Sequence, residues 1–268
     1  MGRKYFVDEG FFDEITKESA WVLGWLITDG SVTSENGWQI KWMLKSTDRE
    51  VLEKLKNTMK YTGKISDYSH KDGRKSSKLC ICNRKMVESL YSLGIPKKDK
   101  TTTVEMLDIP DEYFWDFVRG VFEGDGHIRH RRGNTDALDI TIAGASEKFI
   151  LGLKSALEKR GVFMRLEIRK PNSKSGNKIP LYILTTRSNA DALRMCYFMY
   201  QNTTDSLRLS RKFDVFSNYV RTYYDNIVRR SKECIELVEL CRKQIPECNP
   251  DNELITCTKP FLKLKETA

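Results

Sequence analysis

The stretch VLGWLITDG, residues 22–30, returns later in the chain as VRGVFEGDG, residues 118–126. The glycine at the third place and the Asp-Gly pair at the end coincide in the two copies, and the residues between them are mostly apolar. An internal repeat of this kind predicts two similar structural units in one chain. In each unit, the apolar run before Asp-Gly predicts a buried helix that stops at a glycine in the left-handed conformation.

The two aspartates of the repeat, Asp29 and Asp125, would lie at helix C-termini. The helix dipole is already negative there, so a carboxylate is unfavourable by about 0.3–1 kcal/mol. Because an unfavourable carboxylate occurs at both helix ends, we infer a compensating positive charge. A divalent cation with oxygen ligands is the simplest candidate. The alternative is a pair of core helices with ordinary glycine caps and incidental aspartates.

Small residues four positions apart form a stripe on each predicted helix. Gly24 and Thr28 make the stripe in the first copy, and Gly120 and Gly124 make it in the second. Glycine inside a helix costs about 1 kcal/mol relative to alanine, so its paired use predicts that the two helices pack closely and in parallel through these stripes. Both carboxylates would then meet at one end, where they repel each other unless one is protonated or metal lies between them. Such a metal site suits in-line hydrolysis of a phosphodiester.

Both stretches resemble the signature helix of the LAGLIDADG homing endonucleases, in the single-chain form that carries two signatures. The glycine and the final Asp-Gly match in both copies, and the resemblance covers about residues 15 to 215. It implies that Asp29 and Asp125 are the metal-binding catalytic acids. It also implies Mg²⁺ as the cofactor, with Mn²⁺ as a substitute and with Ca²⁺ supporting binding without cleavage.

A positive group near each carboxylate would stabilise charge on the phosphate. In the family such a basic residue follows the last helix of each repeat. Lys100 matches this place in the first copy and Lys212 in the second, where Arg211 is a competitor. Lys41 and Gln39 are second-tier candidates. The alternative is that all of these are linker and surface charges.

The rest of each copy shows strand and helix patterns in the same order. Residues 38–45 alternate between apolar and largely polar side chains, which predicts a strand with one buried face, and residues 138–143 repeat the pattern. The stretch 31–37, before the first of these strands, is rich in turn residues. The further elements predicted are helices at 48–59, 83–93, 146–159 and 189–200, and strands at 64–70, 77–82, 164–169 and 181–186. Ser146 is a plausible N-cap for the third of these helices.

This order matches the fold of the resembled family and places the chain in the α+β class. We expect two pseudosymmetric αββαββα repeats with curved antiparallel DNA-binding sheets, plus a C-terminal helical extension. The first repeat spans residues 1–100, the second 101–218 and the extension 219–268, and the two repeats form one body. In the extension, residues 220–242 predict one amphipathic helix that ends before Pro246. The extension is either an extra DNA contact or a stabilising appendage.

Basic and amide side chains follow the polar strand faces and the loops. A two-stranded ribbon fits the DNA major groove, where Arg, Lys and Gln read guanine and adenine edges, and basic loop tips hold phosphates. The alternative is an ordinary solvated surface. The residues predicted to contact DNA are Gln39, Lys41, Lys45, Lys71, Arg74, Lys75, Lys78, Arg129, Arg131, Arg165, Arg169, Lys174 and Lys178. Lys41 and Lys45 of one copy correspond to Thr141 and Ala143 of the other, which predicts an asymmetric target.

Bulk properties agree with a polyanionic partner. The 268 residues carry a formal net charge of +9. No apolar run is long enough to span a membrane, and the N-terminal residues lack a signal-peptide pattern. Seven irregularly spaced cysteines predict reduced thiols and an intracellular location. None of them forms the tight C-x2-C pair that a structural zinc site needs.

The sequence therefore predicts a monomeric, Mg²⁺-dependent, site-specific double-strand DNA endonuclease, of the kind that a mobile element encodes for intron homing. One alternative is a maturase that uses the same surface to fold intron RNA. Another is a non-cleaving transcription regulator on a degenerate form of the fold. Such a regulator usually carries a helix-turn-helix appendage, and we find no convincing one after residue 219.

Overall fold

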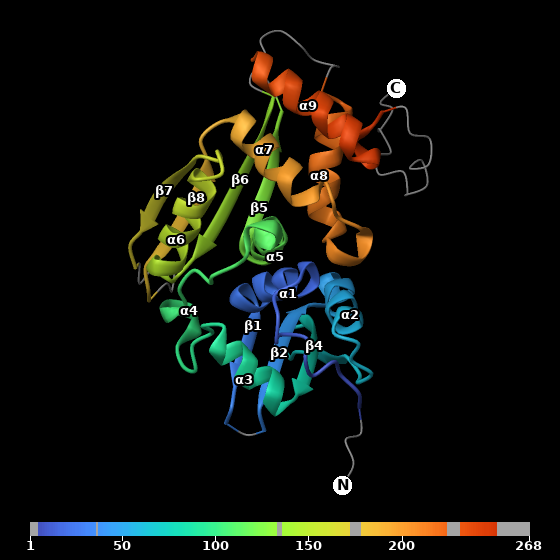
Figure 1. Ribbon diagram of the computed structural model, residues 1–268, viewed down its shortest axis with the longest axis vertical. Helices are drawn as coiled ribbons and strands as arrows, with labels where there is room; N and C mark the ends of the chain where they lie inside the picture. The colour runs from blue at the N-terminus through green and yellow to red at the C-terminus, as the bar shows by residue number, and fades with distance from the viewer. Residues whose placement is uncertain (1–4, 36, 133–135, 172–177, 224–230, 251–268) are drawn as a thin grey trace.

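Two four-stranded antiparallel sheets form the framework of the protein, one in each repeat, and two helices pack side by side between the repeats (Figure 1). These helices are α1 (Lys17–Thr28) and α5 (Phe114–Asp125), which carry the duplicated stretch. The computed structural model describes residues 5–35, 37–132, 136–171, 178–223 and 231–250.

The first repeat builds a sheet with the strand order β1-β2-β4-β3, against which helices α2 and α3 pack. In β2 the side chains of Ile40, Trp42 and Leu44 are buried, and the residues between them lie on the opposite face. The bounds are β1 Gly30–Thr33, β2 Gln39–Lys45, α2 Arg49–Thr58, β3 Ser66–Ser69, β4 Lys75–Cys82 and α3 Arg84–Ser92.

The second repeat follows the same plan, with the strand order β5-β6-β8-β7. A short helix, α4 (Lys100–Thr103), lies in the connection between the repeats. Ser146 caps α6 as predicted, because its side chain accepts from the amide of Phe149. The bounds are β5 Gly126–Arg131, β6 Ala137–Gly144, α6 Glu147–Glu158, β7 Met164–Arg169, β8 Leu181–Thr186 and α7 Asn189–Tyr200. The predicted α+β fold of two αββαββα repeats is confirmed.

The glycines after the two acids do not adopt the predicted left-handed conformation. Gly126 is extended, with φ −90° and ψ 162°, and Gly30 already belongs to strand β1. Glycine is needed for another reason, which is space against the last helical turn. A Cβ on Gly30 would lie 2.8 Å from the Leu26 carbonyl oxygen, and one on Gly126 would lie 2.4 Å from the Phe122 carbonyl oxygen. The chain therefore passes directly from each acid into a strand.

The stretch after Asp29 was predicted to be rich in turns, but it begins with a strand, as does the stretch after Asp125. Strand β1 pairs with β2 so that Ser31 lies opposite Lys41, and β5 pairs with β6 so that His127 lies opposite Thr141. Because β1 and β5 lie at sheet edges and are largely polar, apolar periodicity could not reveal them.

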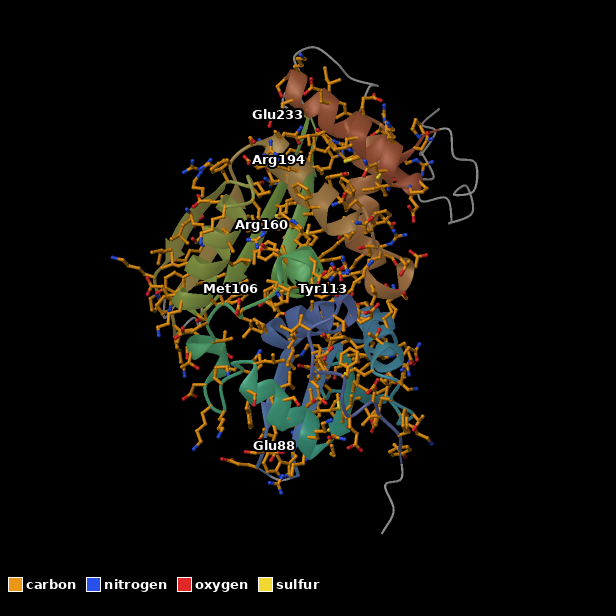
Figure 2. The ribbon with its side chains drawn as sticks, viewed as in Figure 1. Glu88, Met106, Tyr113, Arg160, Arg194 and Glu233 are labelled. Atoms are coloured by element: carbon orange, nitrogen blue, oxygen red, sulfur yellow. The ribbon has the colours of Figure 1, made fainter. Side chains whose placement is uncertain are left out.

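The C-terminal part contains two helices rather than the single one predicted for residues 220–242. Helix α8 (Ser210–Arg221) is followed by a turn at Thr222, and α9 (Lys232–Gln244) is a separate helix. Arg194 on α7 forms an ion pair with Glu233 at the start of α9 (Figure 2). Arg242 on α9 donates to the carbonyl oxygen of Val220 at 2.7 Å. The extension thus braces α7 and the end of α8.

Among the described residues, no helix has both the length and the apolar character required to cross a lipid bilayer. Six cysteines lie in the described part of the chain, and all six carry free thiols. Cys234 and Cys241 are buried on α9, and Cys248 is buried just beyond it, so the spacing of seven marks an inward face.

Candidate active site at the paired helix ends

Helices α1 and α5 touch through their glycines. A Cβ built on Gly24 would lie 2.7 Å from the Cα of Gly120, and one built on Gly120 would lie 2.2 Å from the carbonyl oxygen of Trp21. One turn further on, a Cβ on Gly124 would lie 2.0 Å from Oγ1 of Thr28. Because each step along α1 meets the matching step along α5, the helices run in the same direction. Any side chain at these glycines would push them apart.

The parallel packing brings the two acids together. Asp29 is the C-cap residue of α1, and Asp125 is the last residue of α5. A Cβ on Gly124 would lie 3.0 Å from Oδ2 of Asp29, so the first carboxylate reaches the end of the second helix. Both acids are exposed at their outer edges. The site is therefore open to a large ligand on the side where the helices end.

The environment of the acids disfavours two negative charges. Burial of its inner side by the helix ends and, to a smaller extent, the neighbouring Asp29 together raise the pKa of Asp125 to about 6. Burial likewise raises the pKa of Asp29, although the nearby ammonium groups of Lys212 and Lys100 oppose this. A bound cation would relieve this repulsion.

Two lysines hold the ends of the same two helices in matching ways. Lys100 Nζ donates to the carbonyl oxygen of Leu26 at 2.8 Å and also to that of Ile27, both in the last turn of α1. Lys212 Nζ donates to the carbonyl oxygens of Phe122 and Glu123, each at 2.7 Å, in the last turn of α5. Each ammonium group thus donates to carbonyls in the last turn of its helix and offsets the negative end of the dipole.

Both lysines have lowered pKa values. Burial lowers the pKa of Lys100 to about 8, although the charges of Asp125 and Asp29 raise it. Burial and, to a smaller extent, the neighbouring Arg211 together lower the pKa of Lys212 to about 8. Near neutral pH each lysine therefore carries its charge but releases it more readily than an exposed lysine.

The competitor to Lys212 lies outside the site. Arg211 forms an ion pair with Asp48 at the surface, with 3.0 Å between Nε and Oδ1. The structure therefore brings together Asp29, Asp125, Lys100 and Lys212, the four residues that the sequence suggested for catalysis.

The donor set at the helix ends suits a hard divalent cation. Mg²⁺ typically takes one or two carboxylates and completes its shell with water and substrate phosphate oxygens. In the described part of the chain no group of three or more His, Cys, Asp or Glu side chains gathers to form a closed metal cage. Asp29 and Asp125 would therefore hold the ion by two carboxylates and leave its other positions to a phosphate and water.

The outer face of the first sheet carries the predicted lysines. The register sets Lys41 beside Cys80 and Met43 beside Lys78, all on the face opposite the core. Gln39 and Lys45 lie on the same face of β2. Lys71, Arg74 and Lys75 lie at the tip of the hairpin between β3 and β4, where Arg74 pairs with Asp72 at 2.7 Å.

The second sheet carries arginines that are already paired with carboxylates. Arg129 and Arg131 on β5 both contact Oδ2 of Asp139 on β6, at 3.1 Å and 2.6 Å. Arg169 on β7 pairs with Glu167 at 2.7 Å. Arg165 and Lys178 are exposed, and Lys174 falls outside the described residues. The sequence analysis did not single out Asp139 or Glu167, because a single carboxylate among basic residues forms no recognisable sequence motif.

The two sheets match position by position, with one correction to the predicted alignment. Trp42 pairs with the glycine after the first acid, and Ile142 pairs with the glycine after the second, so the two residues are equivalent. Lys41 therefore corresponds to Thr141, as predicted. Ala143 corresponds to Met43, however, and not to Lys45.

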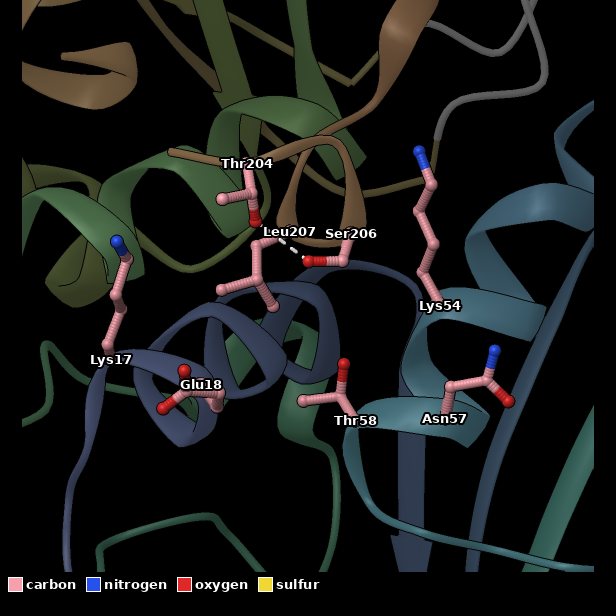
Figure 3. A pocket seen from close by; sticks show the side chains of 8 residues that line it. All are labelled: Lys17, Glu18, Lys54, Asn57, Thr58, Thr204, Ser206 and Leu207. Atoms are coloured by element: carbon pink, nitrogen blue, oxygen red, sulfur yellow. Dashed lines mark hydrogen bonds between the residues drawn. The ribbon is translucent and has the colours of Figure 1, made fainter. Parts of the chain in front are cut away.

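A separate pocket of 510 Å³ lies at the opposite end of α1, between α2 and the loop before α8 (Figure 3). Lys17 and Lys54 line it, but each donates to a backbone carbonyl, of Asn202 and Arg208 respectively. Since neither acid lines this pocket, it is distinct from the helix-end site.

A sequence model of the LAGLIDADG-like domain matches this chain twice, at residues 16–93 and 115–196. Each match contains one of the two acids, and together they cover more than half of the chain. The chain therefore belongs to the LAGLIDADG family, and the resemblance predicted from the duplicated stretch is confirmed.

An uncharacterized protein of Methanocaldococcus jannaschii is 27% identical over 160 residues, which make up 56% of this chain and 17% of that protein. The matched part is thus only a small share of the curated relative. Full-length DUF199/WhiA from Thermatoga maritima superposes with a TM-score of 0.50 at 12% identity, covering 87% of this chain and 70% of that one. This likeness shows the fold.

Solved homing endonucleases also resemble the chain in shape. I-DmoI in complex with DNA and Ca has a TM-score of 0.45 at 14% identity, covering 72% of this chain and 92% of that one. I-GzeII in complex with its DNA target has a TM-score of 0.48 at 14% identity, covering 84% of this chain and 98% of that one.

Proposed function

We propose that this protein is a site-specific double-strand DNA endonuclease that hydrolyses phosphodiesters at a long, asymmetric target with a divalent metal ion. The observation that carries the proposal is the pair of acids at the ends of two parallel helices, each helix end held by its own lysine. A structural helix pair would need neither the matched acids nor the matched lysines.

In this proposal Asp29 and Asp125 hold the cation between the two repeats. When bound, a divalent cation supplies an activated water and stabilises the leaving oxygen of an in-line displacement. The carboxylates orient that centre from two sides, because each is fixed at the end of a buried helix. Mg²⁺ is the ion we propose, with Mn²⁺ able to replace it and Ca²⁺ supporting binding alone.

Lys100 and Lys212 would stabilise negative charge on the reacting phosphates. Each ammonium group is anchored by helix carbonyls, so it keeps its position before DNA arrives and needs no reorganisation during the reaction. Because each lysine belongs to one helix end, we assign each to the phosphate of one strand.

The sheets would bind the target on both sides of the helix ends. Lysines on the first sheet and arginines on the second would contact base edges and phosphates, and their different chemistry favours an asymmetric sequence. Both halves of the site come from one chain, so we propose a monomer. The role of mobile-element endonuclease, as in intron homing, follows from this activity and belongs to the same proposal.

The experiment that tests the proposal is cleavage of a pooled plasmid library with randomised inserts, by the wild type and by Asp29→Asn, in Mg²⁺ and in Ca²⁺. Double-strand cuts at one sequence in Mg²⁺, absent from the variant and absent in Ca²⁺, are the expected result. DNA binding without cuts in any metal would replace the proposal by a non-cleaving regulator. Preferential binding of structured intron RNA would replace it by a maturase.

A further inference from the structure

A buried carboxylate with no counterpart in the first repeat lies next to the site. Glu123 on α5 is 0% exposed, and the equivalent residue of α1 is Ile27. An unpaired buried carboxylate is costly, so its presence in one repeat only requires partners that the other repeat does not supply.

Those partners come from both repeats. Oε2 of Glu123 accepts from Nε1 of Trp21 at 2.8 Å and from Nε1 of Trp25 at 3.3 Å, both on α1. Oε1 accepts from the backbone amide of Leu209 at 2.8 Å. Leu209 is the N-cap residue of α8. One side chain on α5 therefore joins the first repeat to the start of α8.

The start of α8 is the segment that carries Lys212. This lysine lies one turn after Leu209, and its Nζ reaches the backbone carbonyl of Glu123 at 2.7 Å. The side chain of Glu123 fixes where α8 begins, and its main chain receives the ammonium group that α8 delivers. Lys100 has no such support, because it projects from the short helix α4 and Ile27 offers no acceptor side chain.

A second side chain on α5 holds the segment that leads into α8. Arg119, one turn before Glu123, donates to the carbonyl oxygens of Leu207 and Met199, each at 2.8 Å, and to Asp116 Oδ1 at 2.7 Å. Arg119 thus orders the incoming loop, whereas Glu123 contacts the N-cap itself. Asp191 on α7 is also buried and accepts from the backbone amide of Phe163 at 2.9 Å, but it has no hydrogen bond to α5 or α8 among the described residues, which makes it a control outside this network.

We propose that Glu123 is a positioning residue that places Lys212 at the end of α5, tied to the tryptophans of the first repeat. This inference rests on the proposed endonuclease function. In the second repeat the catalytic lysine is positioned by Glu123, and the first repeat has no equivalent residue. Cleavage of the two strands of the target therefore depends on different sets of residues.

Glu123→Gln tests this role because an amide cannot replace the carboxylate. Both carboxylate oxygens accept from N–H groups, and in either orientation the amide nitrogen of glutamine would face a donor. We expect the strand that is slowed in Lys212→Met to be cut about tenfold more slowly in Glu123→Gln as well, so that nicked plasmid accumulates. Asp191→Asn should slow neither strand selectively.

A double-mutant cycle separates positioning from general damage. Added to Lys212→Met, Glu123→Gln should have almost no further effect on cleavage, because both changes act through the same ammonium group. Added to Lys100→Met, it should multiply the loss. Equal effects in the two backgrounds, or slowing of the other strand, would overturn the proposal.

Hydrogen exchange provides a readout that does not require cleavage. In Glu123→Gln the amides of residues 207–213 should exchange faster than in the wild type, while those of residues 98–104 around Lys100 stay unchanged. Trp21→Phe removes one donor and keeps an aromatic side chain, and should produce the same pattern to a smaller degree, even if Glu123→Gln fails to fold. Unchanged exchange at 207–213 in Trp21→Phe would contradict the proposal. If the wild type cuts no DNA but the two variants still show these changes in exchange, the endonuclease function is refuted. The role of Glu123 in holding the start of α8 would then still stand.

Discussion

At the ends of α1 and α5 the two repeats match in their acids and in the lysines that hold the helix ends. Asp29 corresponds to Asp125, and the lysine that donates to the last turn of α1 corresponds to the lysine that donates to the last turn of α5. On the outer faces of the sheets the repeats differ. On the first sheet, neither of the residues that lie opposite Lys41 on the neighbouring strands is a carboxylate. On the second sheet, the arginines are held by Asp139.

This difference between the helix ends and the sheet faces indicates which part of the molecule the proposed chemistry constrains. In the proposed reaction two phosphodiesters of the same kind are hydrolysed, so the groups around them stay equivalent. The bases on the two sides of a target need not be equivalent, so the recognition faces are free to diverge once the two copies share a chain. Glu123 combines both cases. It has no equivalent in the first repeat, but the lysine that it supports, Lys212, has the equivalent Lys100.

The largest expected effect is the loss of either acid. Asp29→Asn and Asp125→Asn should each lower the rate of double-strand cleavage about a thousandfold or more, because each removes one of the two carboxylates that hold the cation. DNA affinity, measured by fluorescence anisotropy in Ca²⁺, should fall far less than the rate. Substantial cleavage by one of the two variants would contradict the prediction that the two acids have equivalent roles.

The lysines should produce the next largest effect and determine the alkaline limit of activity. Lys100→Met and Lys212→Met should each slow cleavage of one strand about 10- to 100-fold, as measured by single-turnover assays on end-labelled DNA. In the wild type, activity should rise as Asp125 loses its proton near pH 6 and fall as the lysines lose theirs near pH 8. A rate that keeps rising well above pH 8 would contradict the proposed role of the lysines.

The glycines at the helix contact should affect stability rather than chemistry. Gly24→Ala and Gly120→Ala should each lower the free energy of unfolding by about 1–3 kcal/mol, because the added methyl group meets backbone atoms of the facing helix. Urea unfolding followed by circular dichroism measures this loss. Gly10→Ala is the control, since a Cβ there meets only side-chain atoms. A loss for Gly10→Ala as large as that for Gly24→Ala would contradict the packing argument.

The smallest expected effects lie on the sheets, where the repeats differ. Asp139→Asn should free Arg129 and Arg131, strengthen non-specific DNA binding and lower the discrimination between bases about tenfold in the half-site bound by the second repeat. Lys41→Thr, which gives the first sheet the residue of the second, should reduce the slope of log affinity against log salt by about one. Anisotropy titrations at several salt concentrations measure both changes. If Asp139→Asn leaves base discrimination unchanged, the carboxylate is only a surface partner.

Much of the fold could be predicted from local patterns. Residues 39–45 alternate between apolar and largely polar side chains and are buried on one face, so β2 was found by period alone. Strands β1 and β5 were not, because a short polar edge strand is stabilised by pairing that has no local signature. The single helix predicted for 220–242 was wrong, because α8 ends at Arg221 and α9 begins only at Lys232.

The sequence by itself determined the duplication, the two acids and the small residues between them, since each is a matter of residue identity at a fixed spacing. It also suggested Lys100 and Lys212, but Arg211 remained a competitor. Only the tertiary structure decided between them, because it shows which side chain reaches the carbonyls of α5 and which one pairs with Asp48. It likewise revealed Glu123 as the link to α8, since its partners Trp21, Trp25 and Leu209 are distant in sequence and meet only after both repeats have packed.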